Sequence, residues 1–125
     1  MPRHIVIVDD DRDTREMLQT LLEADGYTTR AAPNGLRLLS TLYVDRADLI
    51  LLDVMMSWID GFELCQAIKR NPKFAEIPVM FISGKVSEAD RQKGLSCGAI
   101  DYFRKPLDTD RLLTRIHEVA GPPDS

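Results

Sequence analysis

The stretch IVIVDD, residues 5–10, decides the fold class of this chain. Four consecutive β-branched apolar residues favour a strand, and the absence of apolar–polar alternation indicates that both of its faces are buried. Two carboxylates end the run, so the strand is expected to leave the core at a polar edge. Four further short apolar runs follow, roughly every 25 residues, at positions 27–32, 49–52, 79–82 and 100–103.

Segments with the apolar spacing of helices lie between these runs. The first is marked by Met17, Leu18, Leu21 and Leu22, an expected core-facing stripe, and the others by residues 36–42, 62–68 and 112–119. A further helix is expected to start at Ser87, where Asp90 completes a capping box. Gly94 inside this helix costs about 1 kcal/mol relative to alanine. We therefore expect this fourth helix to be the least stable.

Five strand–helix repeats predict an α/β domain with an open parallel sheet and right-handed crossovers. Residues 1–120 are expected to form this single domain, and residues 121–125 (GPPDS) to be a tail or linker stub.

The composition is that of an ordinary globular protein, with 44% hydrophobic and 29% charged residues. No segment has the length of a signal peptide core or a membrane span, so a cytoplasmic protein without a membrane partner is expected. The net charge of −4 argues against direct nucleic-acid binding. Cys65 and Cys97, placed in two separate predicted helices, lack metal-ligand spacing and are expected to be buried thiols.

Polar side chains follow four of the five predicted strands. Asp9 and Asp10 follow the first, Asp53 the third, Ser83 the fourth and Lys105 the fifth. The carboxyl ends of parallel strands meet at one edge of the sheet, so these groups are expected to converge. Three carboxylates about 4 Å apart would repel by roughly 4 kcal/mol per pair at a dielectric of 20. One lysine and one divalent cation balance them, and hard oxygen ligands suit Mg2+.

Asp53 is the best-placed phosphoryl acceptor in this group. A carboxylate beside Mg2+ and an ammonium is suited to attack, because both cations stabilise charge on the transferring oxygens. The Ser83 hydroxyl and the Lys105 ammonium are then available as donors to the bound phosphoryl group.

These residues, in this order and spacing, resemble the receiver domain of bacterial two-component response regulators. The resemblance covers residues 4 to about 120 and rests on Asp9-Asp10, Asp53, Asp60-Gly61, Ser83 and Lys105-Pro106. It implies a flavodoxin-like fold, with a doubly wound five-stranded parallel sheet in the order 2-1-3-4-5 flanked by five helices.

The resemblance also implies a role for each site residue. Asp53 would accept a phosphoryl group from a sensor histidine kinase or a phosphotransfer protein, in a reaction that requires Mg2+. Asp10, Asp53 and the backbone carbonyl of Met55 would ligate the metal directly, and Asp9 would act through water. A cis peptide bond would join Lys105 to Pro106. The protein would be a signalling switch and not a conventional enzyme.

Switching in this family couples Ser83, drawn toward the phosphoryl group, to Tyr102, whose ring moves inward. The implied readout face comprises the fourth helix, the fifth strand and the fifth helix, and it would bind a second copy or a downstream effector. Tyr102 is equally well read as a plain core residue. Asp11 and Asp13 are interpreted as a helix cap and a favourable first-turn charge.

Four residues around the predicted site carry expectations of their own. Ser57 occupies a position where the family usually has proline, which puts the rigidity of that loop in question, and Trp58 is expected to be exposed beside the pocket. Met55 would obstruct water and Lys85 would hold the phosphoryl group, so slow self-dephosphorylation is expected. A half-life of only seconds would contradict this expectation.

Two alternative functions fit parts of the same pattern. A haloacid-dehalogenase-like phosphatase also uses a strand-end aspartate and Mg2+, but its Asp-x-Asp-x-Thr/Val pattern starts correctly at neither Asp9 nor Asp10. A degenerate receiver would have the fold without phosphorylation and would act as a constitutive interaction module. The intact set of five site residues argues against this second alternative.

Overall fold

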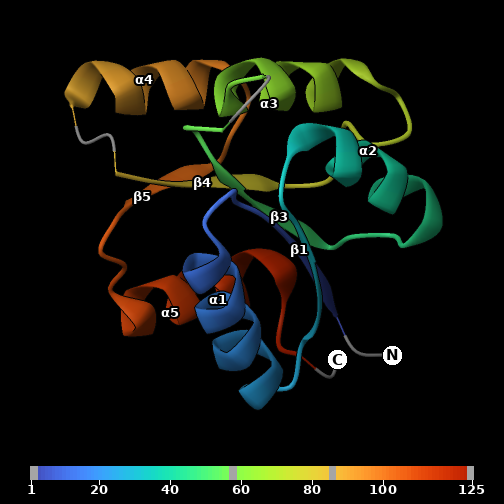
Figure 1. Cartoon of the computed structure of the whole chain (residues 1–125), viewed down its shortest axis with the longest axis vertical. Helices are drawn as coiled ribbons and strands as arrows, with labels where there is room; N and C mark the ends of the chain where they lie inside the picture. The colour runs from blue at the N-terminus through green and yellow to red at the C-terminus, as the bar shows by residue number, and fades with distance from the viewer. Residues whose placement is uncertain (1–2, 57–58, 85–86, 124–125) are drawn as a thin grey trace.

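The computed structural model describes residues 3–56, 59–84 and 87–123 of the chain, and it alternates five strands with five helices (Figure 1). The strands are β1 (His4–Val8), β2 (Thr28–Ala32), β3 (Leu49–Asp53), β4 (Val79–Ser83) and β5 (Asp101–Arg104). The helices are α1 (Arg12–Ala24), α2 (Gly35–Val44), α3 (Gly61–Arg70), α4 (Glu88–Ser96) and α5 (Thr109–Ala120).

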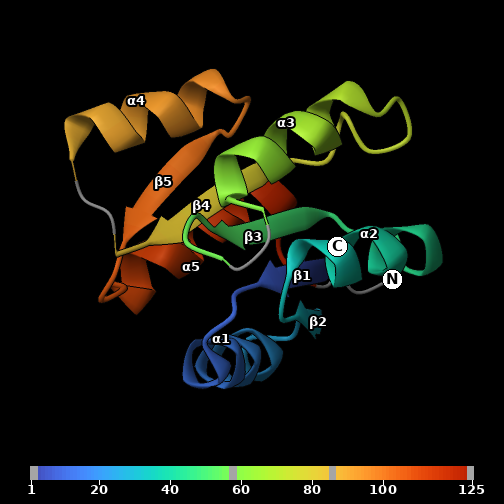
Figure 2. The same ribbon diagram turned by 45° about the horizontal axis from the view of Figure 1, so that its top comes forward.

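All strand pairs are parallel, and the sheet has the order β2-β1-β3-β4-β5. Helices α2, α3 and α4 cover one face of the sheet, and α1 and α5 cover the other (Figures 1 and 2). The predicted flavodoxin-like fold and strand order are therefore confirmed. Strand order reverses between β1 and β3, which is where ligands bind in open α/β sheets.

The three central strands are buried because helices cover both of their faces. Every residue of β3 and β4 is buried, as are four of the five residues of β1. Alternate residues enter two separate cores. Val6 and Leu52 pack under α2 and α3, whereas Ile7 and Leu51 pack against α1 and α5. The continuous apolar runs in the sequence are thus explained by burial on both sides.

Each helix begins at a residue whose side chain accepts a hydrogen bond from the first turn. The N-caps are Asp11, Asn34, Asp60, Ser87 and Asp108. The predicted cap of α1 is confirmed. At α4 the Asp90 N–H donates to Ser87 Oγ at 3.0 Å, and the Ser87 hydroxyl donates to the Asp90 carboxylate at 2.7 Å. This cap offsets the weak burial of α4, whose one fully buried residue is Gly94.

Several local expectations are wrong in detail. Met17 is exposed and does not face the core, because it lies on the outward side of α1. Cys97 is the C-cap of α4 and lies outside the helix, although it is buried as expected. The expectations for Ser57, Trp58 and Lys85 concern positions outside the described residues.

Within the described part of the chain, no helix combines the length and the apolar character that a membrane crossing needs.

Candidate functional site

A hollow of about 520 Å³ opens at the carboxyl edge of the sheet, above the ends of β1, β3 and β5. The loops that follow these strands and Gly84 after β4 line it, and its residues with charged side chains are Asp9, Asp10, Asp11, Asp53 and Lys105. Asp9 follows β1 directly and Asp53 is the last residue of β3, and the strands place both at this edge because Val8 pairs with Leu52 in the parallel register. Convergence of these residues, predicted from topology, is present in the structure.

Three carboxylates in the hollow form a group with the geometry of a metal site. Asp9, Asp10 and Asp53 each present one oxygen, and these three atoms lie within 4.8 Å of one another. Asp9 and Asp53 are buried, whereas Asp10 is exposed. A set of carboxylate oxygens with one side open to water fits a hard cation such as Mg2+, which keeps several of its waters when bound.

Asp9 is held by hydrogen bonds at every oxygen. Its Oδ1 accepts from the Asp11 N–H at 2.9 Å, and its Oδ2 accepts from Lys105 Nζ at 2.7 Å. The backbone carbonyl of Asp9 accepts from Arg15 Nη1 at 2.8 Å. This network fixes the loop that carries Asp10 and leaves the Asp10 carboxylate free to face a ligand. Arg15 was not predicted, because an arginine on a helix gives no sequence signal that it will reach back to a carbonyl.

Asp53 is 4% exposed and lies close to both Asp9 and Lys105. Its Oδ1 accepts a hydrogen bond from the Met55 N–H at 3.3 Å, and its Oδ2 lies 3.6 Å from Lys105 Nζ. Burial, together with the charge of Asp9, raises the pKa of Asp53 to about 6, although Lys105 and the Met55 N–H act in the opposite direction. The charged form of Asp53 is therefore disfavoured, and a bound cation would stabilise it.

Lys105 is the counter-charge that the protein itself supplies. Burial alone would lower the pKa of Lys105, but the hydrogen bond to Asp9 and the charges of Asp53 and Asp9 outweigh burial, so the pKa is raised. The residue stays an ammonium throughout the physiological range. A cis peptide bond joins it to Pro106, as the resemblance implied.

Because the pKa of Asp53 is raised, the stability difference between the metal-free parent and Asp53→Asn is expected to depend on pH. The folded state holds the Asp53 proton up to about pH 6, whereas the unfolded chain releases it near 3.8. Stability from this group is therefore present at low pH and is lost as pH rises through that window. In Mg2+-free buffer, Asp53→Asn is expected to be about 1–3 kcal/mol more stable than the parent at pH 7.5, since about two pKa units separate the states. Thermal unfolding of both proteins from pH 4 to 8 measures the difference, which should shrink toward pH 4.

Excess Mg2+ provides the control for this pH prediction. The metal should stabilise the parent protein and leave Asp53→Asn nearly unaffected, because the variant lacks one of the three carboxylates of the cluster. A stability difference that stayed constant from pH 4 to 8 would contradict the raised pKa assigned to Asp53.

Ser83 and Tyr102 are both buried and do not line the hollow. Ser83 ends β4 and is fully buried, and among the described residues that line the hollow it does not appear. Tyr102 on β5 is 8% exposed. Burial raises the pKa of the Tyr102 hydroxyl, and a hydrogen bond with Ser83 partly opposes that shift. The two residues predicted to act together are thus in contact.

Gly61, at the start of α3, lies close to the backbone of Asp53. Its N–H donates to the Val54 carbonyl at 2.8 Å, at the first residue of α3. A Cβ atom at this position would lie 2.3 Å from the Asp53 carbonyl oxygen and 2.8 Å from Val54 Cα. Only glycine lets α3 start this close to the end of β3. The sequence pattern included Gly61 but did not indicate this close backbone approach.

The chain matches known proteins over nearly its whole length. Residues 5–117 match the family model described as the response regulator receiver domain. The transcriptional regulatory protein GltR of Pseudomonas aeruginosa is 40% identical over 114 residues, which are 91% of this chain and 47% of GltR. An uncharacterised 14.6 kDa protein of Leptolyngbya boryana is 37% identical over 97% of this chain and 94% of its own length. The chain thus spans about half the length of GltR.

Solved structures of similar proteins share the fold. The Vibrio cholerae chemotaxis protein CheY4 superposes with a TM-score of 0.89 at 27% identity, over 95% of this chain and 99% of CheY4. The signal receiver domain of a DNA-binding response regulator from Colwellia psychrerythraea 34H gives a TM-score of 0.88 at 30% identity. That match covers 93% of this chain and 96% of the other.

Proposed function

Because the chain belongs to the response regulator receiver domain family, we propose that it is a signalling switch that is phosphorylated on Asp53 in a Mg2+-dependent reaction. One observation supports this proposal above all. The Asp53 carboxylate opens into a hollow where Asp9 and Asp10 offer metal ligands and Lys105 Nζ stands 3.6 Å away. An acceptor, a metal site and a fixed cation are the parts that phosphoryl transfer requires.

Each residue has a distinct part in the proposed reaction. An Asp53 oxygen attacks the phosphorus of a phosphohistidine on the partner whose other ring nitrogen is protonated. The new O–P bond forms as the N–P bond breaks, and the histidine leaves as neutral imidazole, keeping that proton. Asp10, Asp53 and the Met55 carbonyl would hold Mg2+, with Asp9 acting through water, and the bound ion would neutralise charge on the phosphoryl oxygens. Lys105 stays near both Asp9 and Asp53 and would donate to the phosphoryl group.

The conformational response would begin at Ser83. A phosphoryl group on Asp53 carries about two negative charges and offers strong acceptors to a nearby hydroxyl. Ser83 would turn toward it, which breaks its present contact with Tyr102 and frees the tyrosine to move. The face formed by α4, β5 and α5 would report this change, and Gly94, the buried residue of α4, lies against Phe81 and Tyr102.

The partners and boundaries follow from the same proposal. A sensor histidine kinase or phosphotransfer protein would donate the phosphoryl group in the cytoplasm, and a second copy or an effector would bind the α4–β5–α5 face. Residues 1–120 would form the receiver domain and 121–125 a tail or linker. No nucleic acid or membrane would bind directly.

Mass spectrometry after incubation with acetyl phosphate tests the proposal. With Mg2+ present, the chain should gain the mass of one phosphoryl group, located on the peptide that contains Asp53, and EDTA should prevent the gain. Continuous release of phosphate at a fixed rate from a monoester would instead favour a phosphatase. Failure to bind beryllofluoride with Mg2+ would favour a degenerate receiver that acts as an interaction module.

Replacing Asp10 by asparagine is expected to lower Mg2+ affinity without lowering the stability of the metal-free protein. Its side chain is exposed, so Asp10→Asn should leave the unfolding free energy of the metal-free protein within about 0.5 kcal/mol of the parent. Loss of one charged ligand should weaken Mg2+ binding roughly ten-fold or more. A Mg2+ titration followed by amide NMR shifts measures the affinity, and thermal unfolding in Mg2+-free buffer measures the stability. Asp13→Asn, an exposed acid in the first turn of α1 and outside the cluster, is the matched control.

A further inference from the structure

Helix α2 exposes more apolar side chain than its neighbours. Among the described residues, the three most exposed large apolar side chains all belong to it: Leu36 (77%), Tyr43 (62%) and Val44 (80%). Surface helices of globular proteins normally present polar residues to solvent. The outward side of α2 is therefore an apolar surface that the described part of the chain leaves largely exposed.

The apolar residues of α2 form two separate stripes. Leu38 and Leu42, four positions apart, are buried against the sheet. Leu36, Leu39 and Tyr43 follow the three–four spacing of a helix-pairing seam, and Leu36 and Tyr43 are seven residues apart on the same side. They span roughly 10 Å along the helix axis. A second helix laid along α2 would cover this seam.

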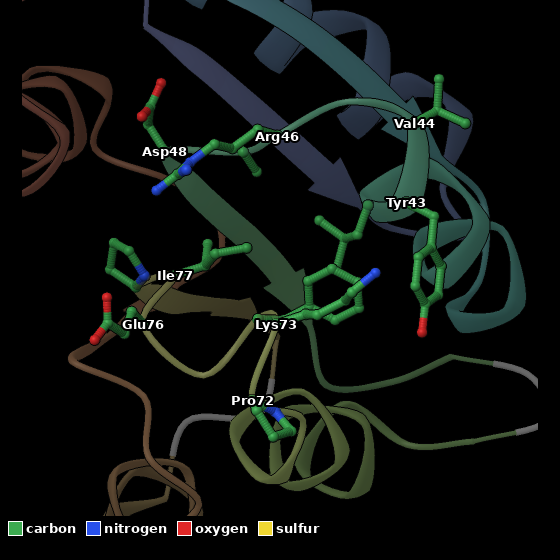
Figure 3. Close-up of a pocket in the computed structure, with 12 residues that line it drawn as sticks. Tyr43, Val44, Arg46, Asp48, Pro72, Lys73, Glu76 and Ile77 are labelled. Atoms are coloured by element: carbon green, nitrogen blue, oxygen red, sulfur yellow. The ribbon is translucent and has the colours of Figure 1, made fainter.

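A hollow of about 500 Å³ adjoins the carboxyl end of α2 (Figure 3). The end of α2 and its following loop form one wall, and residues 72–78, between α3 and β4, form the other. Asp48 and Pro78, which directly precede β3 and β4, also line it. The hollow is thus at the amino ends of the strands, at the opposite edge of the sheet from Asp53.

The walls of this hollow are held in place before any partner binds. The Tyr43 ring meets Phe74 edge-on, with centroids 5.1 Å apart, and Lys73 Nζ lies 5.2 Å from the centre of the Tyr43 ring. Lys69 Nζ reaches from α3 to donate to the carbonyls of Ala75 at 3.2 Å and Ile77 at 2.6 Å. An exposed aromatic side chain that is already ordered loses little entropy on binding.

The charges around this surface favour an acidic partner. Helix α2 contains no acidic residue, and Arg37, Arg46 and Lys73 are all exposed. Glu76 is the opposing exposed anion, whereas the charges of Asp48 and Asp45 are offset by ion pairs with Arg3 and Arg30. In the described structure neither Arg46 nor Glu76 forms an ion pair. The surface carries a local excess of positive charge in a chain whose net charge is −4.

We propose that the α2 surface and the adjoining hollow bind an acidic amphipathic helix of a protein partner. Its apolar side would cover Leu36, Leu39 and Tyr43, and its carboxylates would meet Arg46 and Lys73. The hollow, Arg46 and Lys73 lie at the edge of the sheet opposite Asp53, so binding there would not require phosphorylation. The site is thus distinct from both the phosphoryl site and the α4–β5–α5 face, and it goes beyond the proposed switch function.

An NMR titration with a synthetic peptide tests this inference. The probe is a capped peptide of about five helical turns with leucine at heptad core positions and glutamate and alanine elsewhere. Amide shifts should concentrate on α2 and residues 72–78, in the absence of Mg2+ and in Asp53→Asn alike. The double variant Arg46→Glu/Lys73→Glu should weaken binding roughly five-fold or more, and added salt should weaken it further. A peptide with lysine in place of glutamate should not bind.

The matched control reverses two exposed arginines elsewhere on the molecule, in Arg104→Glu/Arg111→Glu. If this control weakened binding as much as the α2 variant, or if the shifts mapped to β5 and α5, the inference would be overturned. Equal binding of the lysine peptide, or no α2 shifts with either peptide, would overturn it as well. Shifts in α2 that depended on protein concentration alone would identify a second copy as the occupant and would also refute it.

Discussion

Asp53→Asn is expected to abolish phosphorylation by acetyl phosphate entirely, while the variant folds at least as stably as the parent. The substitution keeps the shape of the side chain but removes the nucleophilic charge and one charged metal ligand. The buried Asp53 is the one described carboxylate that both faces Lys105 at 3.6 Å and accepts from the Met55 N–H. Labelling followed by intact mass should show no added phosphoryl group.

Asp110→Asn is the matched control, because Asp110 is an exposed acid on α5 that lies outside the cluster. It should be labelled to the same extent as the parent. Full labelling of Asp53→Asn at another residue would show that the acceptor has been wrongly assigned, whatever the fate of the Mg2+ site. Loss of labelling in both variants would point to a general defect in folding and not to the acceptor.

Gly61→Ala is expected to give the largest loss of stability of any single methyl addition considered. The new Cβ would stand 2.3 Å from the Asp53 carbonyl oxygen and 2.8 Å from Val54 Cα, and both neighbours are backbone atoms that cannot rotate away. Overpacking of this kind costs about 3 kcal/mol, since strand and helix must separate. A thermal midpoint lower by roughly 10 °C is the expected result in a calorimetric scan.

Alanine variants of two other glycines serve as comparisons for this prediction. A Cβ at Gly84 meets no heavy atom within 4 Å, so Gly84→Ala should change stability by less than about 0.5 kcal/mol. At Gly94 the nearest atoms are ring carbons of Phe81 and Tyr102 at 3.0 Å, and these side chains can shift. Gly94→Ala should therefore fall between the other two. A Gly61→Ala protein as stable as Gly84→Ala would show that the end of β3 and the start of α3 separate easily.

The fold was predictable because its signals are local and repeated. The runs at 49–52 and 79–82 have no polar interruption, and only a strand covered on both faces explains such runs in a chain of ordinary composition. Gly26 after the first helix and the N-caps Asp11 and Ser87 set element boundaries by backbone chemistry alone. Met17 and Leu36 were harder, because a periodic pattern does not say which of two apolar stripes meets the sheet.

The members of the site were predictable one by one, but their environment was not. Asp9, Asp10, Asp53 and Lys105 follow strand ends, and the parallel topology brings such ends together. The hydrogen bond from Arg15 to the Asp9 carbonyl and the close approach of Gly61 depend on helix packing angles, which the spacing of residues does not encode. Ser83 is a further example, because burial places it beside Tyr102 and away from the hollow.

The sequence alone predicts the five-stranded parallel sheet and the convergence of carboxylates at one of its edges, because apolar periodicity and strand-end charges are properties of adjacent residues. Only the tertiary structure shows that the pKa of Asp53 is the one raised and which residues contact this carboxylate. It also shows that α2 presents an ordered apolar seam beside Arg46 and Lys73. These properties arise from desolvation and packing between segments far apart in the chain, and such energies exist only once the segments are in contact.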